Sequence, residues 1–192
     1  MRIGILAVQG DYEAHAKVLQ QLGVEYVFVF KPEDMAGIKG LILPGGESTT
    51  QLKFLQEEGL LEAIRKFASE GCAFFGTCAG AILLAKEVKN PAQASLGFAD
   101  MAVLRNAYGR QLVSRVTQGT CKLTSQPVEM VFIRAPIIDR VGEGVEVLAE
   151  LEGHPVLVRQ GRVLAATFHP ELTGDTTIHK HFLKLVANGS AK

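Results

Sequence analysis

Short apolar runs alternate with amphipathic stretches in the first half of the chain. Residues 11–23 (DYEAHAKVLQQLG) carry apolar side chains at helical spacing and end on a glycine, so they predict a helix. The flanking apolar runs are too short and too continuous for amphipathic helices and are typical of buried strands. These strand candidates are residues 2–8 (RIGILAV), 25–30 (EYVFVF) and 40–44 (GLILP).

The same alternation continues through residue 88. Residues 60–71 (LLEAIRKFASEG) predict an amphipathic helix that ends at a glycine, and residues 72–77 (CAFFGT) predict the next strand. Residues 79–88 (AGAILLAKEV) predict a helix that starts directly after that strand. Strands and helices in this order indicate a parallel sheet that is covered by helices on both faces.

The second half is richer in strands. Residues 155–168 (PVLVRQGRVLAATF) predict a hairpin with Gly161 in its turn, and residues 177–188 (TIHKHFLKLVAN) predict a closing helix. Further strands are expected at 101–106, 128–134 and 145–151. We therefore predict an α/β fold with a mixed, mainly parallel central sheet. Neither a linker nor a repeat divides the chain, so residues 1–192 are predicted to form one domain.

Composition narrows the function classes. The 192 residues include 20 basic and 20 acidic side chains, so net charge gives no reason to expect nucleic acid or an anionic membrane as partner. The apolar N-terminal run is too short to span a bilayer, and a cytoplasmic location is predicted. The three cysteines, at positions 72, 78 and 121, form no CxxC pair, which argues against a disulfide framework or a zinc ribbon.

Cys78 stands in a special context, within residues 74–81 (FFGTCAGA). A buried Cys is often only a small hydrophobe. Here Gly76, Ala79 and Gly80 surround it between a strand and a helix, which is the pattern of a nucleophile elbow. The helix start would favour a thiolate, and the Ala79 amide could help to bind an oxyanion.

His169 is the best partner for such a thiol. It follows an apolar strand, and Glu171 lies two residues on, where an extended segment would place it on the same side. The carboxylate could then orient the imidazole as a general base. The other four histidines, at 15, 154, 179 and 181, are interpreted as structural or solvated, and 179 and 181 make a poor metal pair.

A third element is the segment 41–49 (LILPGGEST). Gly45 and Gly46 let the backbone approach a ligand, whereas a bland tight turn with a Ser or Thr helix cap is the alternative. No GxxxxGK[ST] motif is present, which excludes a P-loop. Beside an elbow on a neighbouring strand, the segment is interpreted as a second oxyanion donor and a wall of the substrate pocket.

Taken together, these motifs resemble the triad-type (class I) glutamine amidotransferases. Nucleophile, His and then Glu two residues later is the order of that class. Within it, the chain is similar to the glutaminase subunits of pyridoxal 5′-phosphate synthases from residue 3 to about residue 173. The similarity rests on LAVQGD, LPGGESTT, FGTCAGAILLAK, LRNAYGRQ, FIRAP and FHPELT. Ala107 is one departure, where the family usually has Ser.

The resemblance implies a role for each matching position. Cys78 would attack the side-chain amide of glutamine, His169 would move protons and Glu171 would orient it. The amides of Gly46 and Ala79 would form the oxyanion hole. Glutamine would be held by Gly46 and by a further set of residues: Glu47, Ser48, Arg105, Ile133, Arg134 and, more weakly supported, Gln9.

The implied reaction is hydrolysis of L-glutamine to glutamate and ammonia through a thioester, without metal or organic cofactor. Ammonia would pass to a synthase subunit, in a hetero-oligomeric complex, that makes pyridoxal 5′-phosphate from ribose 5-phosphate and glyceraldehyde 3-phosphate. Three alternatives stay open at this point. They are a glutaminase subunit of another pathway, a cysteine peptidase of related fold, and a non-catalytic subunit that has kept the fold.

Overall fold

A computed structural model describes residues 1–106 and 114–189. Its strands form a nine-stranded sheet, ordered β2-β1-β3-β4-β12-β11-β10-β7-β8, and a three-stranded sheet, ordered β5-β6-β9. The strands of the large sheet are β1 (Arg2–Leu6), β2 (Glu25–Val29), β3 (Gly40–Leu43), β4 (Ala73–Thr77), β7 (Ser114–Cys121), β8 (Thr124–Ile133), β10 (Glu146–Leu151), β11 (His154–Gln160) and β12 (Val163–Ala166). Those of the small sheet are β5 (Ala85–Lys89), β6 (Ala99–Leu104) and β9 (Ile137–Val141).

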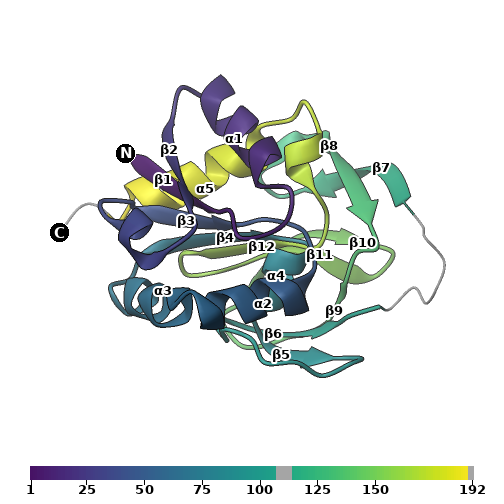
Figure 1. Ribbon diagram of the computed structural model, residues 1–192. Coiled ribbons are helices and arrows are strands. Elements are labelled where there is room, and N and C mark those ends of the chain that lie inside the picture. Colours follow the sequence, from purple (N-terminus) through teal and green to yellow (C-terminus); the bar gives the residue numbers. More distant parts are fainter. Residues whose placement is uncertain (107–113, 190–192) are drawn as a thin grey trace.

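Five helices and two short 3₁₀ segments connect the strands of the described residues (Figure 1). The helices are α1 (Tyr12–Gln21), α2 (Ser48–Glu57), α3 (Leu60–Ser69), α4 (Ala79–Leu84) and α5 (Thr177–Ala187); the 3₁₀ segments are η1 (Pro32–Met35) and η2 (Pro170–Leu172). In Figure 1, α1 and α5 lie on one face of the large sheet, and α2, α3 and α4 lie on the other.

The large sheet has a parallel half and an antiparallel half. Strands β2, β1, β3, β4 and β12 pair in parallel, whereas β12, β11, β10, β7 and β8 pair antiparallel. The predicted mixed sheet with helices on both faces is therefore confirmed. The hairpin predicted around Gly161 joins β11 to β12, and Gly161 has the positive φ of 56° that its turn requires.

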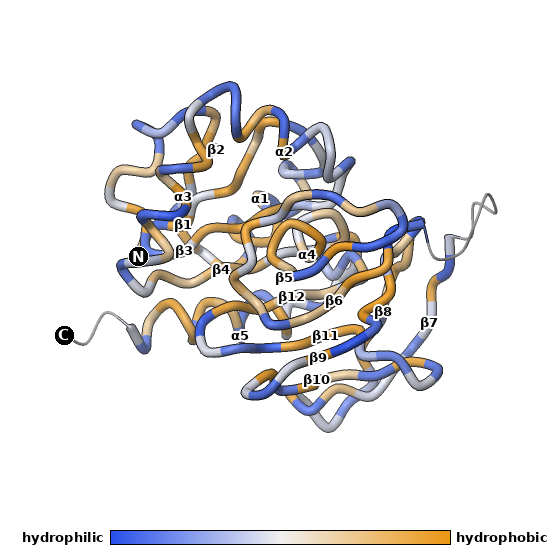
Figure 2. The backbone as a smooth tube through the Cα atoms, turned by 90° about the horizontal axis from the view of Figure 1, so that it is seen from below, coloured by the Kyte–Doolittle hydropathy of each residue, from blue (hydrophilic) through white to orange (hydrophobic). Residues whose placement is uncertain are grey.

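Two hydrophobic clusters hold the layers together, one on each face of the sheet. One contains residues of α2, α3, α4 and the small sheet, and the other contains residues of α1, α5, β7 and β8. Figure 2 shows hydrophobic residues along the inner strands and α4, with hydrophilic segments gathered at the periphery. The burial of strands β3 and β4 at every position explains why their sequences are continuous apolar runs.

The helix predicted over residues 79–88 is too long. It ends at Leu84, and the chain continues as β5, which pairs in parallel with β6. All residues of 79–84 are buried, so this segment has no polar face whose spacing would show where the helix ends. A tertiary pairing therefore overrides the local pattern. Strands β5, β7 and β9 are additions that the sequence pattern did not predict.

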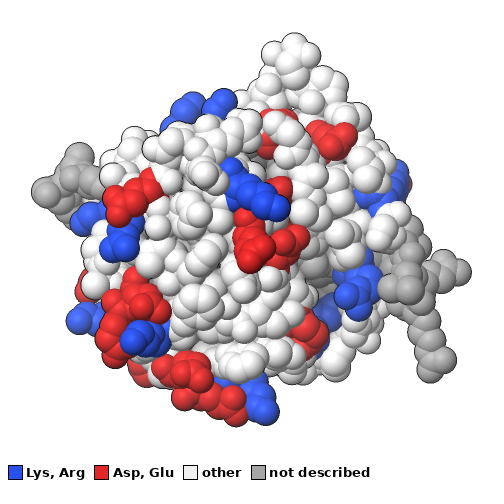
Figure 3. Space-filling model, turned by 45° about the horizontal axis from the view of Figure 1, so that its top comes forward, with Lys and Arg blue, Asp and Glu red and all other residues white. Residues whose placement is uncertain are grey.

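Basic and acidic side chains are interspersed on the face of the molecule shown in Figure 3, so neither sign of charge dominates that face. Within residues 1–106 and 114–189, no helix is long and apolar enough to cross a membrane.

Candidate active site

Three adjacent parallel strands bring the predicted site residues together. Strand β4 pairs with β3 on one side and with β12 on the other. Cys78 follows β4, Gly45 follows β3 by two residues, and His169 follows β12 by three. The carboxyl ends of parallel strands meet at one edge of a sheet, which is where ligands bind in folds of this kind.

The backbone at Cys78 is strained, as the elbow motif predicts. Cys78 has φ 48° and ψ −103°, an uncommon conformation for a residue with a side chain. Its amide donates to the carbonyl of Ala166 at 2.8 Å, which fixes the turn against β12. A Cβ atom on Gly80 would collide with the carbonyl oxygen of Leu43, so only glycine fits there. Crowding of this kind explains why small residues surround the thiol.

His169 and Glu171 form a close hydrogen-bonded pair. Nδ1 of His169 lies 2.7 Å from Oε1 of Glu171, and both residues are buried, with 6% and 5% exposure. Burial by itself would lower the pKa of His169, but hydrogen bonds with Cys78 and Glu171 outweigh it and raise the pKa to about 10. Burial would likewise raise the pKa of Glu171, but the His15 ring and the hydrogen bond from His169 hold it below its usual value.

These groups face a cavity of about 340 Å³. It is lined by Gln9, Asp11, Gly45, Gly46, Glu47, Ser48, Cys78, Ile82, Arg105, Asn106, Ile133, Arg134, Pro136, His169 and Leu172. Glu171 and Ala79 lie behind this lining, Glu171 beside His169 and Ala79 as the first residue of α4. Sequence reasoning gave no role to five of these lining residues, although each lies within a motif that carries the family resemblance: Asp11, Ile82, Asn106, Pro136 and Leu172.

Gly46 and Glu47 form the loop that faces the thiol. Gly46 has φ 155°, and a side chain there would meet Oε1 of Gln9. That same oxygen accepts a hydrogen bond from the Glu47 amide at 2.9 Å. Gln9 therefore reaches the site by holding this loop.

The alternative interpretation of this turn, with a helix cap by Ser48 or Thr49, is wrong. Glu47 is the N-cap of α2, and its carboxylate accepts from the amides of Thr49 and Thr50 at 3.2 and 2.7 Å. Partial burial would raise the pKa of Glu47, but the hydrogen bonds from these two threonines lower it to about 2. The longer side chain reaches the free amides because Glu47 itself is extended, with φ −108°.

The charged residues predicted to bind glutamine include two that contact each other. Nη2 of Arg105 lies 3.1 Å from Oε1 of Glu47 and 3.0 Å from Oγ1 of Thr49. Arg134 follows β8 with a positive φ of 46°, and the carbonyl of its neighbour Ile133 lies 3.8 Å from the Cys78 sulfur. Ala107, the departure from the family pattern, lies outside the described residues.

Three buried polar residues behind Glu171 escaped the sequence interpretation. His15 was expected to have no chemical partner, but its ring lies 3.0 Å from His179 and 3.2 Å from the Thr77 hydroxyl. All three side chains belong to residues with 0% exposure. The helical spacing of the apolar residues in α1 places His15 on the buried face, which was the available signal. Its partners come from β4 and α5, and no sequence pattern shows that these elements pack beside α1.

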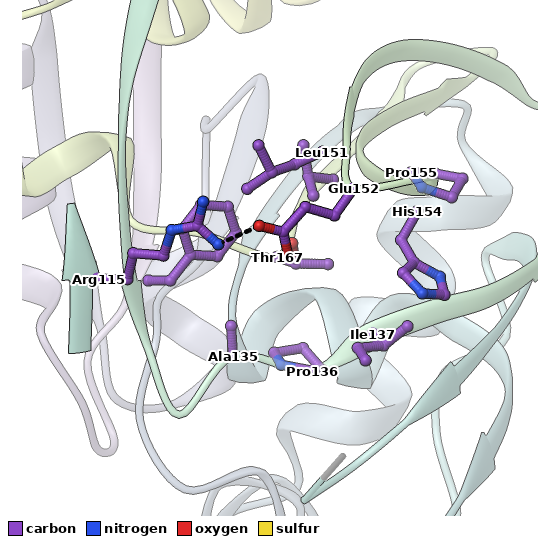
Figure 4. Close-up of a pocket in the computed structure, with 11 residues that line it drawn as sticks. Arg115, Ala135, Pro136, Ile137, Leu151, Glu152, His154, Pro155 and Thr167 are labelled. Atoms are coloured by element: carbon purple, nitrogen blue, oxygen red, sulfur yellow. Dashed lines mark hydrogen bonds and ion pairs between the residues drawn. The ribbon is translucent and has the colours of Figure 1, made fainter. Parts of the chain in front are cut away.

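A second, smaller cavity of about 80 Å³ shares Pro136 with the site but does not include Cys78 (Figure 4). Arg115 and Glu152 form an ion pair across it, and His154 lies at its side. Most of its lining is apolar, and it holds none of the reactive groups described above. The chemistry therefore belongs to the larger cavity.

Comparison with known proteins agrees with this geometry. The "Pyridoxal 5'-phosphate synthase subunit PdxT" of Koribacter versatilis is 58% identical over 191 residues, which cover 100% of this chain and 98% of that protein. The protein of the same name from Thermus thermophilus is 53% identical, covering 95% of this chain and 96% of its own. A solved structure described as a glutamine amidotransferase superimposes with a TM-score of 0.90 at 50% identity, covering 96% of this chain and 98% of that one.

The resemblance to glutamine amidotransferases inferred from the motifs is thereby confirmed. The family profile itself matches residues 5–188, nearly the full length of the chain. The chain belongs to the SNO glutamine amidotransferase family.

Proposed function

We propose that this chain is the glutaminase subunit of a pyridoxal 5′-phosphate synthase, with Cys78, His169 and Glu171 as its catalytic residues. The observation that carries the assignment is the hydrogen-bonded His169–Glu171 pair beside a strained Cys78 at the floor of a cavity of about 340 Å³. The chemistry matches the name of its relatives, which are synthase subunits.

In the first half-reaction, the Cys78 sulfur attacks the side-chain carbonyl carbon of glutamine. The carbonyl π electrons move onto oxygen and give a tetrahedral intermediate. His169, held as a proton donor by its raised pKa, then protonates the departing nitrogen, and the C–N bond breaks. The products are ammonia and a γ-glutamyl thioester on Cys78.

In the second half-reaction, His169 takes a proton from water as the water oxygen attacks the thioester. The C–S bond breaks, glutamate leaves, and the thiolate of Cys78 returns to its starting position beside the imidazolium of His169. Glu171 stays a carboxylate throughout and keeps Nδ1–H of His169 directed toward itself, so that Nε2 faces the reacting atoms.

The developing oxyanion would be stabilised by backbone amides. Ala79 is the first residue of α4, and amides in the first turn of a helix have no acceptor within the helix. The amide of Gly46 would be the second donor. The positive φ of Gly46 permits a rotation of the adjacent peptide, which would turn this amide toward the oxyanion. Before that rotation, the hydrogen bond from the Glu47 amide to Gln9 would hold the loop in its present form.

The polar ends of glutamine require groups of both signs. Arg105 suits the α-carboxylate, and Glu47 with nearby carbonyls suits the α-ammonium. Since Arg105 and Glu47 now pair with each other, substrate binding would exchange that contact for two contacts with the ligand. Ser48, Ile133 and Arg134 line the same cavity and would complete the pocket.

Ammonia would be delivered to the synthase subunit within a hetero-oligomeric complex in the cytoplasm. Leu172 lies at the cavity with 41% of its surface exposed, one of few large hydrophobic side chains so exposed among the described residues. A docked partner would cover such a side chain and keep ammonia from water.

The test is glutamate release from L-glutamine by the purified chain, with and without an added pyridoxal 5′-phosphate synthase subunit. We expect strong stimulation by that subunit, and loss of turnover in Cys78→Ala. Cys72→Ala is the matched control, because Cys72 precedes β4 outside the cavity and should leave activity intact. Turnover by Cys78→Ala at the wild-type rate would refute the proposed role of the thiol.

A further inference from the structure

Behind the His169–Glu171 pair, three buried side chains form a chain of contacts that the reaction above does not use. Oγ1 of Thr77 donates to Oε1 of Glu171 at 3.3 Å. Nε2 of His15 lies 3.2 Å from the same hydroxyl and 3.6 Å from the carboxylate. Nδ1 of His15 lies 3.0 Å from Nε2 of His179. The chain thus runs from α5 through α1 and β4 to the carboxylate.

Only one direction of hydrogen bonding satisfies these contacts. The carboxylate can only accept, so the Thr77 hydroxyl donates to it and must itself accept from Nε2–H of His15. Nδ1 of a neutral His15 is then an acceptor, and Nε2–H of His179 donates to it. Nδ1 of His179, which has no hydrogen-bond partner among the described residues, is left with a lone pair and not with a stranded N–H.

The reverse direction meets two penalties. It would strand a buried N–H at Nδ1 of His179, and it would turn a lone pair of His15 toward the Glu171 carboxylate. Burial also lowers the pKa of His15, and it lowers that of His179 to about 3, so both rings are neutral at physiological pH.

We propose that Thr77, His15 and His179 are positioning residues, which fix the Glu171 carboxylate through a directed chain of hydrogen bonds so that it orients His169. Among the described residues, the side-chain donors to Glu171 converge on Oε1, whereas Oε2 is buried without a hydrogen-bond partner. Beside the bond from His169 itself, the chain of hydrogen bonds supplies the second donor that holds Oε1 in place. The inference rests on the proposed role of Glu171 in the glutaminase reaction.

The titratable groups around Glu171 come from every element packed against it. They are His15 with Asp11 from α1 and its preceding loop, His179 from α5, His169 before η2, and Cys78 at the end of β4. Among them, His15 and His169 contact the carboxylate directly. Substitutions at Thr77 alter the chain of hydrogen bonds without adding or removing a charge.

The first test is the protonation state of the imidazole nitrogens in the wild-type chain. Nitrogen-15 NMR of the histidine-labelled protein at neutral pH distinguishes the two nitrogens of each ring, and single His→Gln variants assign the five histidines. We expect neutral rings with the proton on Nε2 for both His15 and His179. A proton on Nδ1 of His179, or a charged ring at either position, would overturn the proposed direction.

The second test compares Thr77→Val with Thr77→Ser, because Val keeps the shape of Thr and Ser keeps the hydroxyl. In Thr77→Val we expect kcat for glutamate release to fall about tenfold with KM within about twofold. The pKa of His169, followed in the same NMR spectra, should fall, since its carboxylate partner is less well held. Thr77→Ser should restore most of both properties.

A purely structural role for Thr77 predicts something else. Thr77→Val would then change thermal stability but leave kcat and the pKa of His169 unchanged, or Ser would be as harmful as Val. If the wild type with a synthase subunit released no glutamate, the proposed function would fail. The NMR measurements on that same protein would still decide whether the chain of hydrogen bonds exists and acts on His169.

Discussion

Cys78 separates two polar regions of opposite character. On the open side, Glu47 and Arg105 lie on loops around the cavity, and the Glu47 side chain is 51% exposed. On the closed side, Glu171 contacts Thr77 and His15, residues of β4 and α1 that are fully buried. The open side pairs opposite charges, whereas behind the His169–Glu171 pair the closed side adds the neutral groups of Thr77 and His15.

The difference follows from what each region must do. Glu47 is half exposed although the Arg105 side chain is only 12% exposed, so the carboxylate can exchange its contact with Arg105 for contacts with a ligand at modest cost. A buried carboxylate without its donors is costly, and donors fixed before the reaction begins need no reorganisation during it. Substitutions on the closed side should therefore lower kcat, and substitutions on the open side should mainly raise KM.

The largest effect is expected at the carboxylate of the closed side. Glu171→Gln keeps the shape but removes the charge, and it can present an N–H toward Nδ1 of His169 and so favour the wrong tautomer. We expect kcat to fall about 10³-fold in assays of glutamate release. Glu62→Gln is the matched control, since Glu62 is exposed on α3, and it should retain full activity. An unchanged kcat in Glu171→Gln would remove the distinction between the two sides.

Gly45→Ala tests whether the position of His169 matters as much as its chemistry. The added Cβ would fall on the His169 imidazole and force the ring aside, although Gly45 has no positive φ that would add backbone strain. Misplacing a catalytic group by about 1 Å can cost about 10²-fold in rate, and we expect a loss of kcat of that order.

The control for this substitution is Gly174→Ala. A Cβ there meets no atom within 4 Å, and Gly174 likewise has no positive φ. Steady-state kinetics of the two variants would separate a local clash at His169 from a general cost of replacing glycine. Equal activities would contradict the role assigned to the His169 ring.

On the open side, Arg105→Gln should raise KM for glutamine about tenfold, with a smaller change in kcat, because a charge-assisted hydrogen bond to the α-carboxylate is lost. Arg140→Gln removes a similar cation that pairs with Asp100 outside the cavity, and it should leave KM unchanged. A large loss of kcat with normal KM in Arg105→Gln would place this residue functionally with the closed side.

The smallest effect concerns stability against acid. The pKa of His179 is lowered by burial to about 3, so its contribution to folding is fully present above its unfolded pKa of 6.5 and is lost as the pH falls toward 3. His179→Gln keeps a donor for His15 but does not titrate. Between pH 7 and pH 5 we expect it to lose about 2 kcal/mol less unfolding free energy than the wild type in urea titrations.

His169 does not interfere with this measurement. Its pKa is raised to about 10, so its stabilising contribution is complete below pH 6.5 and decreases only as the pH rises toward 10. If wild type and His179→Gln lost the same unfolding free energy between pH 7 and pH 5, His179 would take up a proton without penalty. That result would contradict the neutral ring assigned to His179 in the buried chain of hydrogen bonds.

Much of the fold could be predicted because its signals are local. Fully buried parallel strands such as β3 and β4 are continuous apolar runs, and glycines mark the ends of the first helices. Where local signals are ambiguous, prediction failed. The segment 85–88 continues the helical pattern of α4, and only its pairing with β6 makes it a strand.

The candidate site divides in the same way. The meeting of Cys78, His169 and Glu171 at one edge of the sheet could be predicted, because each stands in a short motif with a chemical reason for its spacing. His15 and His179 could not, because a histidine on the buried face of a helix has the same pattern whether or not it has a partner. The cap by Glu47 was missed since Ser and Thr are the more frequent caps.

The sequence alone determined the alternation of strands and helices, the tight turn at Cys78 and the pairing of His169 with Glu171, since these depend on neighbours in the chain. Only the tertiary structure decided that Thr77, His15 and His179 meet behind Glu171, and that Glu47 and Arg105 pair across the cavity. These contacts join residues 58 to 164 positions apart. No local pattern encodes such a contact, because it depends on how the helices and strands pack.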